Sequence, residues 1–252
     1  MQILISCAKT MSMADTGVVP AVSRPLFADV ADRIAAQLAA LSAEELGRML
    51  RINARLAAEN RRRYLDFHDA PQQAALAAYT GVVFKRIAPQ TFSEADFVWA
   101  QEHLNITSFL YGLLRPLDAI RPYRLEGDAV LPVADERTLF EFWQERLTEV
   151  LLERIRRDDG VLVNLASGEM KRLFDWPRVV REVRVITPEF RIREGDRLKT
   201  VVVYAKMCRG EMTRWILRER IADPEALHTF DWEGFRFDPE NSRGDRLHFV
   251  MQ

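Results

Sequence analysis

The chain has 252 residues, of which 48% are hydrophobic and 29% are charged. This length can bury one sizeable core, and no stretch rich in Pro, Gly or Ser separates two smaller ones, so we expect a single domain over residues 1–252. Lys and Arg (36) nearly balance Asp and Glu (37), which argues against a general DNA-coating protein. Any nucleic-acid binding would therefore depend on positive side chains gathered in one region of the surface, apart from the negative ones.

The composition also disfavours several other classes of protein. No basic region precedes the short apolar run at the N-terminus, and no uncharged apolar run reaches the length of a membrane span, so we expect a soluble, cytoplasmic protein without a membrane partner. Two cysteines, Cys7 and Cys208, are too few for a disulfide framework. The four histidines are scattered, which predicts no metal site, and we expect no cofactor.

The first part of the chain predicts one strand followed by helices. Residues 1–6 are apolar enough for a buried strand, and residues 27–41 have apolar side chains at helical spacing. Three capping boxes, in which a hydroxyl and a carboxylate satisfy free backbone N–H groups, start further helices. These boxes are Ser42 with Glu45, Ser93 with Asp96, and Thr138 with Glu141. The first of these helices is expected to end in the basic run at 61–63.

The second part of the chain predicts mainly strands. The predicted strands are 161–165, 183–186, 190–193, 198–204, and a closing hairpin of 235–237 with 247–250. Glu194-Gly195-Asp196 is expected to form a hairpin turn, and residues 212–221 a helix. This pattern predicts an α/β fold of the mixed α+β kind, with a mixed central sheet flanked by helices.

Residues 107–123 combine a Gly-containing turn with a Pro-started segment and three arginines, Arg115, Arg121 and Arg124. The pattern is compatible with a helix-hairpin-helix element, in which a tight turn and flanking cations bind nucleic-acid phosphate. A plain helix–helix connection fits the pattern equally well.

Two motifs share a layout in which Ala-Lys is expected to follow a hydrophobic strand. They are ISCAKT, with Lys9, and YAKMCRG, with Lys206 and Arg209. Cations that leave buried strands surface at the strand ends, where open α/β sheets bind ligands, so these three side chains are expected to converge. Unrelated surface lysines are the alternative.

The motif NLASGE follows the strand at 161–165. Its Ser167, with Lys171 and Arg172 close behind, is expected to form a small anion cradle. The motif matches neither a nucleophile elbow nor a P-loop, and it is weak evidence for catalysis.

These motifs together resemble the YaaA family of bacterial peroxide-stress proteins. The family pattern S-P-A-K-T stands here as Ser6 to Thr10, and L-Y-G-x-L-R-P-L-D as Leu110 to Asp118. The remaining matches, in chain order, are Arg121 to Glu126, Phe142-Trp143, Asn164 to Met170, Val203 to Gly210 and Phe230 to Phe237. The resemblance covers nearly the whole chain.

The resemblance implies a YaaA-type fold with a helix-hairpin-helix element and a positively charged cleft. That cleft is expected to bind double-stranded or branched DNA without regard to sequence and to limit oxidative DNA damage. The positions that match the cleft are Lys9, Arg115, Arg121, Arg124, Ser167, Lys206 and Arg209.

The sequence departs from the family pattern at the two Ala-Lys motifs. Cys7 stands where the pattern has Pro, and Cys208 precedes Arg-Gly where the pattern has Ala. If the two motifs are neighbours, Lys9 and Lys206 would favour a reactive Cys7 thiolate. Two small buried thiols that fill space are the alternative.

Two functions therefore follow from the sequence, and it leaves open whether the protein is an enzyme. The first is DNA binding in peroxide stress through a continuous basic groove from Arg115 to Arg209. The second is an enzyme acting on a nucleotide or another anionic small metabolite in the same cleft, with Cys7, Ser167 or Glu169 as nucleophile or acid/base. A closed pocket too narrow for a duplex would favour the enzyme.

Overall fold

The computed structural model of the chain describes residues 1–14 and 19–252. Its strands are β1 (Gln2–Ile5), β2 (Gln73–Ala74), β3 (Leu104–Ser108), β4 (Gly112–Leu114), β5 (Ala119–Ile120), β6 (Val161–Asn164), β7 (Arg184–Glu194), β8 (Arg197–Lys199), β9 (Asp231–Trp232), β10 (Phe235–Phe237) and β11 (Arg246–Met251). The described residues form a nine-stranded sheet in the order β4-β3-β1-β6-β7-β11-β10-β9, with β8 paired to β7. A two-stranded sheet of β2 and β5 is separate from it.

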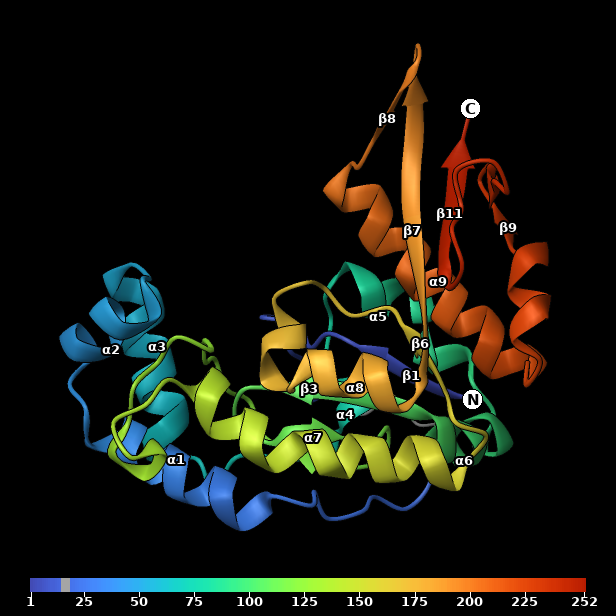
Figure 1. Ribbon diagram of the computed structural model, residues 1–252. Coiled ribbons are helices and arrows are strands. Elements are labelled where there is room, and N and C mark those ends of the chain that lie inside the picture. Colours follow the sequence, from blue (N-terminus) through green and yellow to red (C-terminus); the bar gives the residue numbers. More distant parts are fainter. Residues whose placement is uncertain (15–18) are drawn as a thin grey trace.

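Helices lie between groups of these strands along the chain. The α-helices are α1 (Ala28–Ala40), α2 (Ala43–Leu50), α3 (Ala54–Leu65), α4 (Ala75–Ala78), α5 (Val82–Ile87), α6 (Glu94–His103), α7 (Leu139–Arg157), α8 (Trp176–Glu182) and α9 (Val202–Glu219). Short 3-10 helices are η1 (Pro89–Thr91), η2 (Pro132–Ala134), η3 (Met170–Leu173) and η4 (Pro224–Thr229). In Figure 1, α7 and α8 lie in front of the sheet, and α9 crosses behind β7. The predicted mixed α/β class is confirmed.

β1 lies in the centre of the sheet. It is parallel to β3 on one side and to β6 on the other, and β6, β7 and β11 continue as parallel neighbours. The carboxyl ends of β1 and β6 therefore meet at one edge of the sheet, where parallel sheets bind ligands. Ile3, Leu4 and Ile5 are fully buried, as expected for a strand covered on both faces.

Local signals placed the helix starts correctly. The side chains of Ser42, Ser93 and Thr138 each accept a hydrogen bond from the backbone N–H three residues later. In return, the backbone N–H of each of these residues donates to the carboxylate of that later residue. The strand over 1–6, the helix over 27–41 and the pairing of β10 with β11 are also confirmed. Within the described residues, no helix is long and apolar enough to cross a membrane.

The single helix expected from Ser42 to the basic run is wrong. α2 ends at Leu50 because Arg51 adopts the left-handed conformation, with φ of 52°, and the Asn53 side chain then caps a new helix, α3. The basic run lies at the end of α3, near the negative end of the helix dipole.

The strand expected at 198–204 is also wrong. β8 ends at Lys199, and α9 begins at Val202, so YAKMCRG lies on a helix. The β-branched run Val201 to Val203 favours a strand locally, but the buried residues Ala205, Cys208, Met212 and Ile216 recur at helical spacing and decide the outcome. The two strands expected at 183–186 and 190–193 are one continuous strand, β7.

The helix-hairpin-helix expected at 107–123 is contradicted, because this segment contains no helix. Residues 104–114 form the antiparallel hairpin β3–β4, in which Ile106 faces Leu114 and Ser108 faces Gly112. Gly112 has φ of 73°, and a Cβ there would lie 2.7 Å from the Trp143 ring. Gly112 is therefore required by a tight turn that packs against α7, and it does not form a phosphate-binding hairpin.

Candidate anion-binding site

A cavity of about 510 Å³ opens at the carboxyl ends of β1 and β6. We call it the strand-end pocket. Its polar lining consists of Ser6, Cys7, Lys9, Tyr123, Arg124, Ser167, Glu169, Lys206 and Arg209. Its apolar wall consists of Ala8, Val82, Val83, Phe84, Phe109, Leu125, Leu165 and Met170, with Gly81. A mainly apolar cavity with a few convergent polar groups is typical of a ligand site.

The loops that follow β1 and β6 are joined at this pocket. The Ser167 backbone N–H donates to the Ser6 hydroxyl at 2.9 Å, and the Ser6 and Ser167 hydroxyls lie 3.4 Å apart. The Leu165 N–H donates to the Leu4 carbonyl, which continues the strand pairing up to the loops. The structure thus brings Lys9 and Ser167 together.

Helix α9 brings two further cations to the pocket. Lys206 and Arg209 both line it, so the predicted convergence with Lys9 is observed, although a helix and not a strand carries them. α9 crosses α5 closely, because a Cβ on Gly210 would lie only 2.4 Å from the Val83 carbonyl oxygen. Val82 and Val83 form part of the wall. The crossing of α5 and α9 therefore fixes the positions of both the cations and the wall.

The cations of the pocket differ in their partners. Lys9 Nζ lies 2.8 and 2.9 Å from the two Glu126 carboxylate oxygens, and Arg124 lies 3.7 Å from the same group. Within the described residues, no ion pair includes Lys206 or Arg209, and the Nε atoms of Arg124 and Arg209 are buried without a hydrogen-bond partner. Burial lowers the pKa of Arg209, which marks a partly desolvated guanidinium.

The Cys7 thiol is protonated. Burial, and then the nearby carboxylates of Glu169 and Glu126, raise its pKa to about 12, and the local lysines do not reverse this. Burial likewise raises the pKa of the fully buried Cys208 to about 12. The raised pKa of Cys7 disfavours the reactive thiolate considered from the sequence. The alternative of small buried thiols fits Cys208, whereas Cys7 is partly buried and lines the pocket.

Four of the predicted cations do not line the pocket. Arg121 lies over the Phe67 ring, Arg172 lies over the Phe140 ring and pairs with Asp128, and Lys171 lies over the Trp176 ring. Arg115 pairs with Asp118 and lines a different cavity with Gln2, Asn105 and Arg154. Because that cavity lies at the opposite ends of the same strands, the described residues do not form a continuous groove from Arg115 to Arg209.

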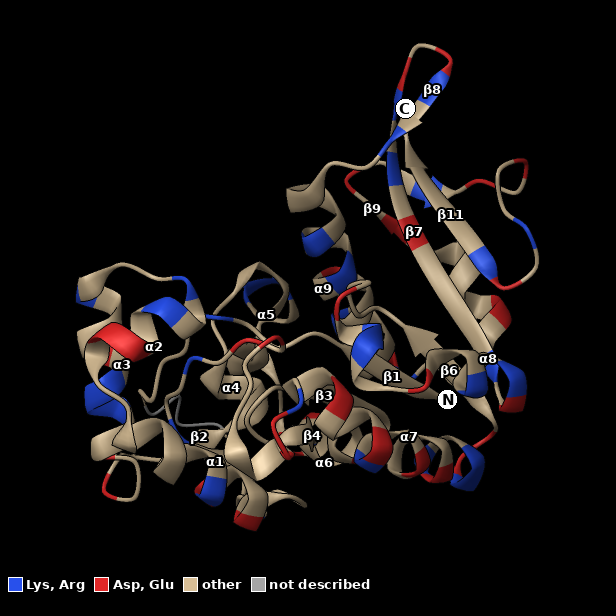
Figure 2. Ribbon diagram, turned by 60° about the vertical axis from the view of Figure 1, so that its left-hand side comes forward, with Lys and Arg blue, Asp and Glu red and all other residues tan. Residues whose placement is uncertain are grey.

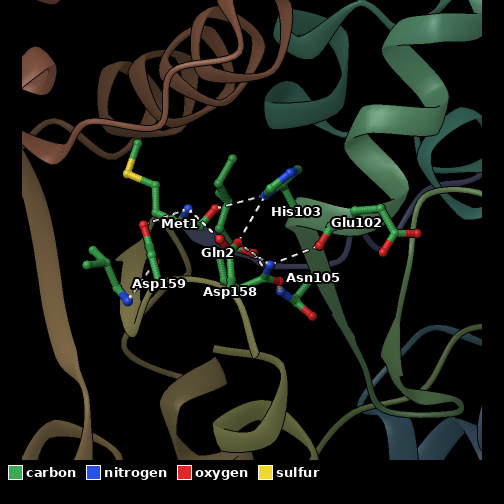
Figure 3. A network of polar contacts seen from close by, with 9 residues as sticks. Met1, Gln2, Glu102, His103, Asn105, Asp158 and Asp159 are labelled. Atoms are coloured by element: carbon green, nitrogen blue, oxygen red, sulfur yellow. Dashed lines mark hydrogen bonds and ion pairs between the residues drawn. The ribbon is translucent and has the colours of Figure 1, made fainter. Parts of the chain in front are cut away.

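A polar network occupies this opposite, amino-terminal edge of the sheet (Figure 3). Asp158 accepts hydrogen bonds from the Met1 ammonium at 3.2 Å and from Gln2 Nε2 at 2.8 Å, and it lies 3.1 Å from His103 Nδ1. Asn105 donates to Gln2, and Arg154 donates to Asn105. The network ties β1, β3 and the turn before β6 together, so it serves the fold.

Sequence reasoning missed two arginines near the pocket, Arg191 and Arg246. Glu189 on β7 lies 2.6 Å from Arg191, 3.2 Å from Arg246 and 3.5 Å from His248, and the register pairs Glu189 with His248 across β7 and β11. We call the surface of Lys171, Glu189, Arg191, Arg209, Arg246 and His248 the basic face. In Figure 2, β7 carries bands of both charges and β11 carries a band of Lys/Arg colour. The only sequence signal for Arg191 and Arg246 was the alternation Glu-x-Arg and Arg-x-His.

The titratable residues do not gather as metal ligands. Within the described part of the chain, no group of three or more His, Cys, Asp or Glu side chains could hold a metal ion. The chemistry of the pocket is that of cations, hydroxyls and one carboxylate, Glu169, beside an apolar wall.

The fold and the pocket define a mixed α/β protein with a cation-lined cavity at its strand ends. The chain belongs to the YaaA family, because the family model described as "Peroxide stress protein YaaA" matches residues 1–241. A UPF0246 protein of Bacteroides thetaiotaomicron is 54% identical over 99% of this chain and 98% of its own length. UPF0246 proteins of Phocaeicola vulgatus and Crocosphaera subtropica are 53% and 33% identical, each over at least 99% of both chains. This membership supports a role in peroxide stress.

Proposed function

We propose that the protein acts in peroxide stress by binding the phosphates of double-stranded or branched DNA at the strand-end pocket, in the cytoplasm. The observation that carries the proposal is the pair of cations on α9, Lys206 and Arg209, which line the pocket and have no ion-pair partner among the described residues. An exposed lysine and a partly desolvated arginine beside a hydroxyl such as Ser167 are suited to a phosphate oxygen.

The charge distribution supports phosphate recognition over base reading. The chain has a formal net charge of −1, so attraction to DNA has to come from the local excess of cations around the pocket. Contacts to phosphates carry no sequence information, which predicts sequence-independent binding that weakens steeply with salt.

The test is fluorescence anisotropy of a labelled duplex and a labelled four-way junction across a salt series. We expect micromolar or tighter binding at low salt, with an affinity that falls as a power of the salt concentration. The variant Lys206→Ala/Arg209→Ala should reduce the number of released counterions by about two and lower the affinity about tenfold or more.

A matched control removes the same charge elsewhere on the surface. Arg157→Ala/Arg218→Ala changes two exposed cations that lie outside the pocket, and it should leave affinity and salt dependence nearly unchanged. Absence of DNA binding at low salt, or equal losses in both double variants, would overturn the proposal.

A second candidate is an enzyme acting on a nucleotide or another anionic small metabolite. The size of the pocket favours it, because about 510 Å³ lies within the range of small-molecule sites and is too narrow for a duplex to enter. The side chains of the pocket give less support to an enzyme. The Cys7 thiol is protonated, and the side chain that contacts the Ser167 hydroxyl is the Ser6 hydroxyl, which is not a general base. Free nucleotides in the same assay, followed for turnover, distinguish the two candidates.

A further inference from the structure

We propose that the strand-end pocket receives one unpaired nucleotide of DNA while the basic face holds the phosphates next to it. This inference rests on the proposed DNA binding and names the form of DNA that the site takes. It predicts a preference for unpaired ends or junction branches over a continuous blunt duplex.

The size and shape of the pocket require an unpaired nucleotide. A cavity of about 510 Å³ that is open on one side can hold a group of nucleotide size, whereas a stacked base pair cannot enter it. Proteins that bring a base into such a pocket take it from a single strand or extrude it from the duplex.

The pocket has an apolar wall for the base of a nucleotide and a polar side for its phosphate. Ala8, Val82 and Val83 are the more exposed residues of the apolar wall, with Phe84, Phe109 and Met170 buried behind them, and a base can pack against this apolar surface. Lys206, Arg209 and the Ser167 hydroxyl supply the polar side, where a phosphate would be bound. An apolar wall of this extent would be unused if the pocket bound only inorganic phosphate.

The basic face carries an excess of positive charge. Four cations, Lys171, Arg191, Arg209 and Arg246, surround the single carboxylate of Glu189. Burial lowers the pKa of His248, and Arg191 and Arg246 lower it further, so this histidine adds no charge at neutral pH. Glu189 holds the arginine side chains in place but leaves a net positive surface for phosphates.

The basic face is continuous with the pocket. Arg209 lines the pocket and is close enough to Glu189 for the carboxylate to raise the arginine's pKa against the effect of burial. Lys171 follows Glu169 of the pocket by two residues, and the charges of Arg246, Glu189 and Arg209 act on its pKa. A strand whose nucleotide enters the pocket would therefore place its neighbouring phosphates against β7 and β11.

The test compares a blunt duplex with the same duplex bearing a short unpaired overhang. A 2-aminopurine in the overhang reports the environment of the unpaired base. We expect the overhang to bind about tenfold more tightly, which corresponds to the stacking of roughly one base, with a change in 2-aminopurine fluorescence.

Two kinds of variant separate the pocket from the basic face. Val82 lines the pocket with an exposed side chain, so Val82→Trp should fill the cavity and abolish both the preference for the overhang and the change in 2-aminopurine fluorescence. Val98→Trp, at an exposed valine outside the pocket, is the matched control. Arg191→Ala/Arg246→Ala should weaken binding of both DNAs about tenfold and reduce the salt dependence.

Each outcome decides between the proposals. Equal affinity for blunt and overhanging DNA, or a fluorescence change that persists in Val82→Trp, would overturn this inference and leave the proposed DNA binding intact. Failure to bind either DNA at low salt would overturn the proposed function itself. A free mononucleotide that binds as tightly as the overhang would also overturn this inference, because the basic face would then contribute nothing.

Discussion

The two cysteines show how a residue's surroundings override its neighbours in sequence. Cys7 lies two residues from Lys9, but that ammonium pairs with Glu126, and Glu126 and Glu169 both raise the pKa of the Cys7 thiol. Lys9 therefore does not create a thiolate. The cysteine fills part of the pocket floor instead.

We expect both thiols to be unreactive toward Ellman's reagent in the native protein at neutral pH, because burial raises the pKa of each to about 12. Unfolding in urea should expose two reactive thiols. Since the folded pKa values exceed the unfolded ones, the stability that the protonated thiols contribute is complete below about pH 8.5 and is lost as pH rises toward 12. Rapid reaction of one thiol in the native protein would contradict this.

At the scale of the element, the crossing of α5 and α9 matters most for the site. Gly210 allows the backbones to approach so closely that a Cβ would lie 2.4 Å from the Val83 carbonyl and 2.6 Å from the Arg86 Cβ. A carbonyl oxygen cannot move away as a flexible side chain can. The cations on α9 therefore keep a fixed distance from the wall supplied by α5.

The variant Gly210→Ala should be destabilised by about 1–3 kcal/mol, because the added methyl group overpacks this crossing. Urea unfolding measures the change. Gly168→Ala is the control, since nothing lies within 4 Å of a Cβ at that position, and it should be neutral or slightly stabilising. Equal stability of Gly210→Ala and the native protein would show that the helices can separate without cost.

Elements with local signals were predicted from the sequence, and elements decided by tertiary contacts were not. The capping boxes at Ser42, Ser93 and Thr138 are satisfied within four residues, so the sequence alone places these helix starts. The first turn of α9 and the hairpin β3–β4 contradict their local patterns, because burial against other elements determines both.

At the scale of the whole molecule, the network around Asp158 joins segments that lie far apart in the chain. Burial alone would raise the pKa of this carboxyl. The hydrogen bond from Gln2 and the Met1 ammonium outweigh that effect, so the pKa lies below its ordinary value of 3.8. A lowered folded pKa stabilises the protein above the ordinary pKa, and this stabilisation is lost as pH falls through the folded value.

We expect Asp158→Asn to lower the free energy of unfolding by about 1–3 kcal/mol at pH 7, because the variant removes a charged acceptor of several hydrogen bonds. The difference from the native protein should shrink at a pH below the ordinary value of 3.8, as the native carboxyl becomes protonated. Urea unfolding at both pH values is the measurement. Asp196→Asn, at an exposed turn residue, should change little, and an Asp158→Asn effect independent of pH would contradict the assignment.

The candidate site was predictable only in part, for reasons of chain topology. Lys9 and Ser167 follow strands whose carboxyl ends meet, and that rule can be applied without a structure. The basic face depends on the register of β7 against β11, in which Glu189 faces His248. No local pattern specifies which residue of one strand faces which residue of a distant strand.

The central position of β1 has a consequence for how the chain is made. Ile3 pairs with Leu104 on one side and with Val163 on the other, so β1 has no partner until β3 and β6 have been synthesised after it. β7 likewise lacks its β11 partner until the segments between them have been made. Such non-local pairing slows folding and leaves apolar strands exposed to aggregation during synthesis. The supply of folded protein should thus be limited by folding as well as by translation, and chaperones that shield nascent strands should raise it.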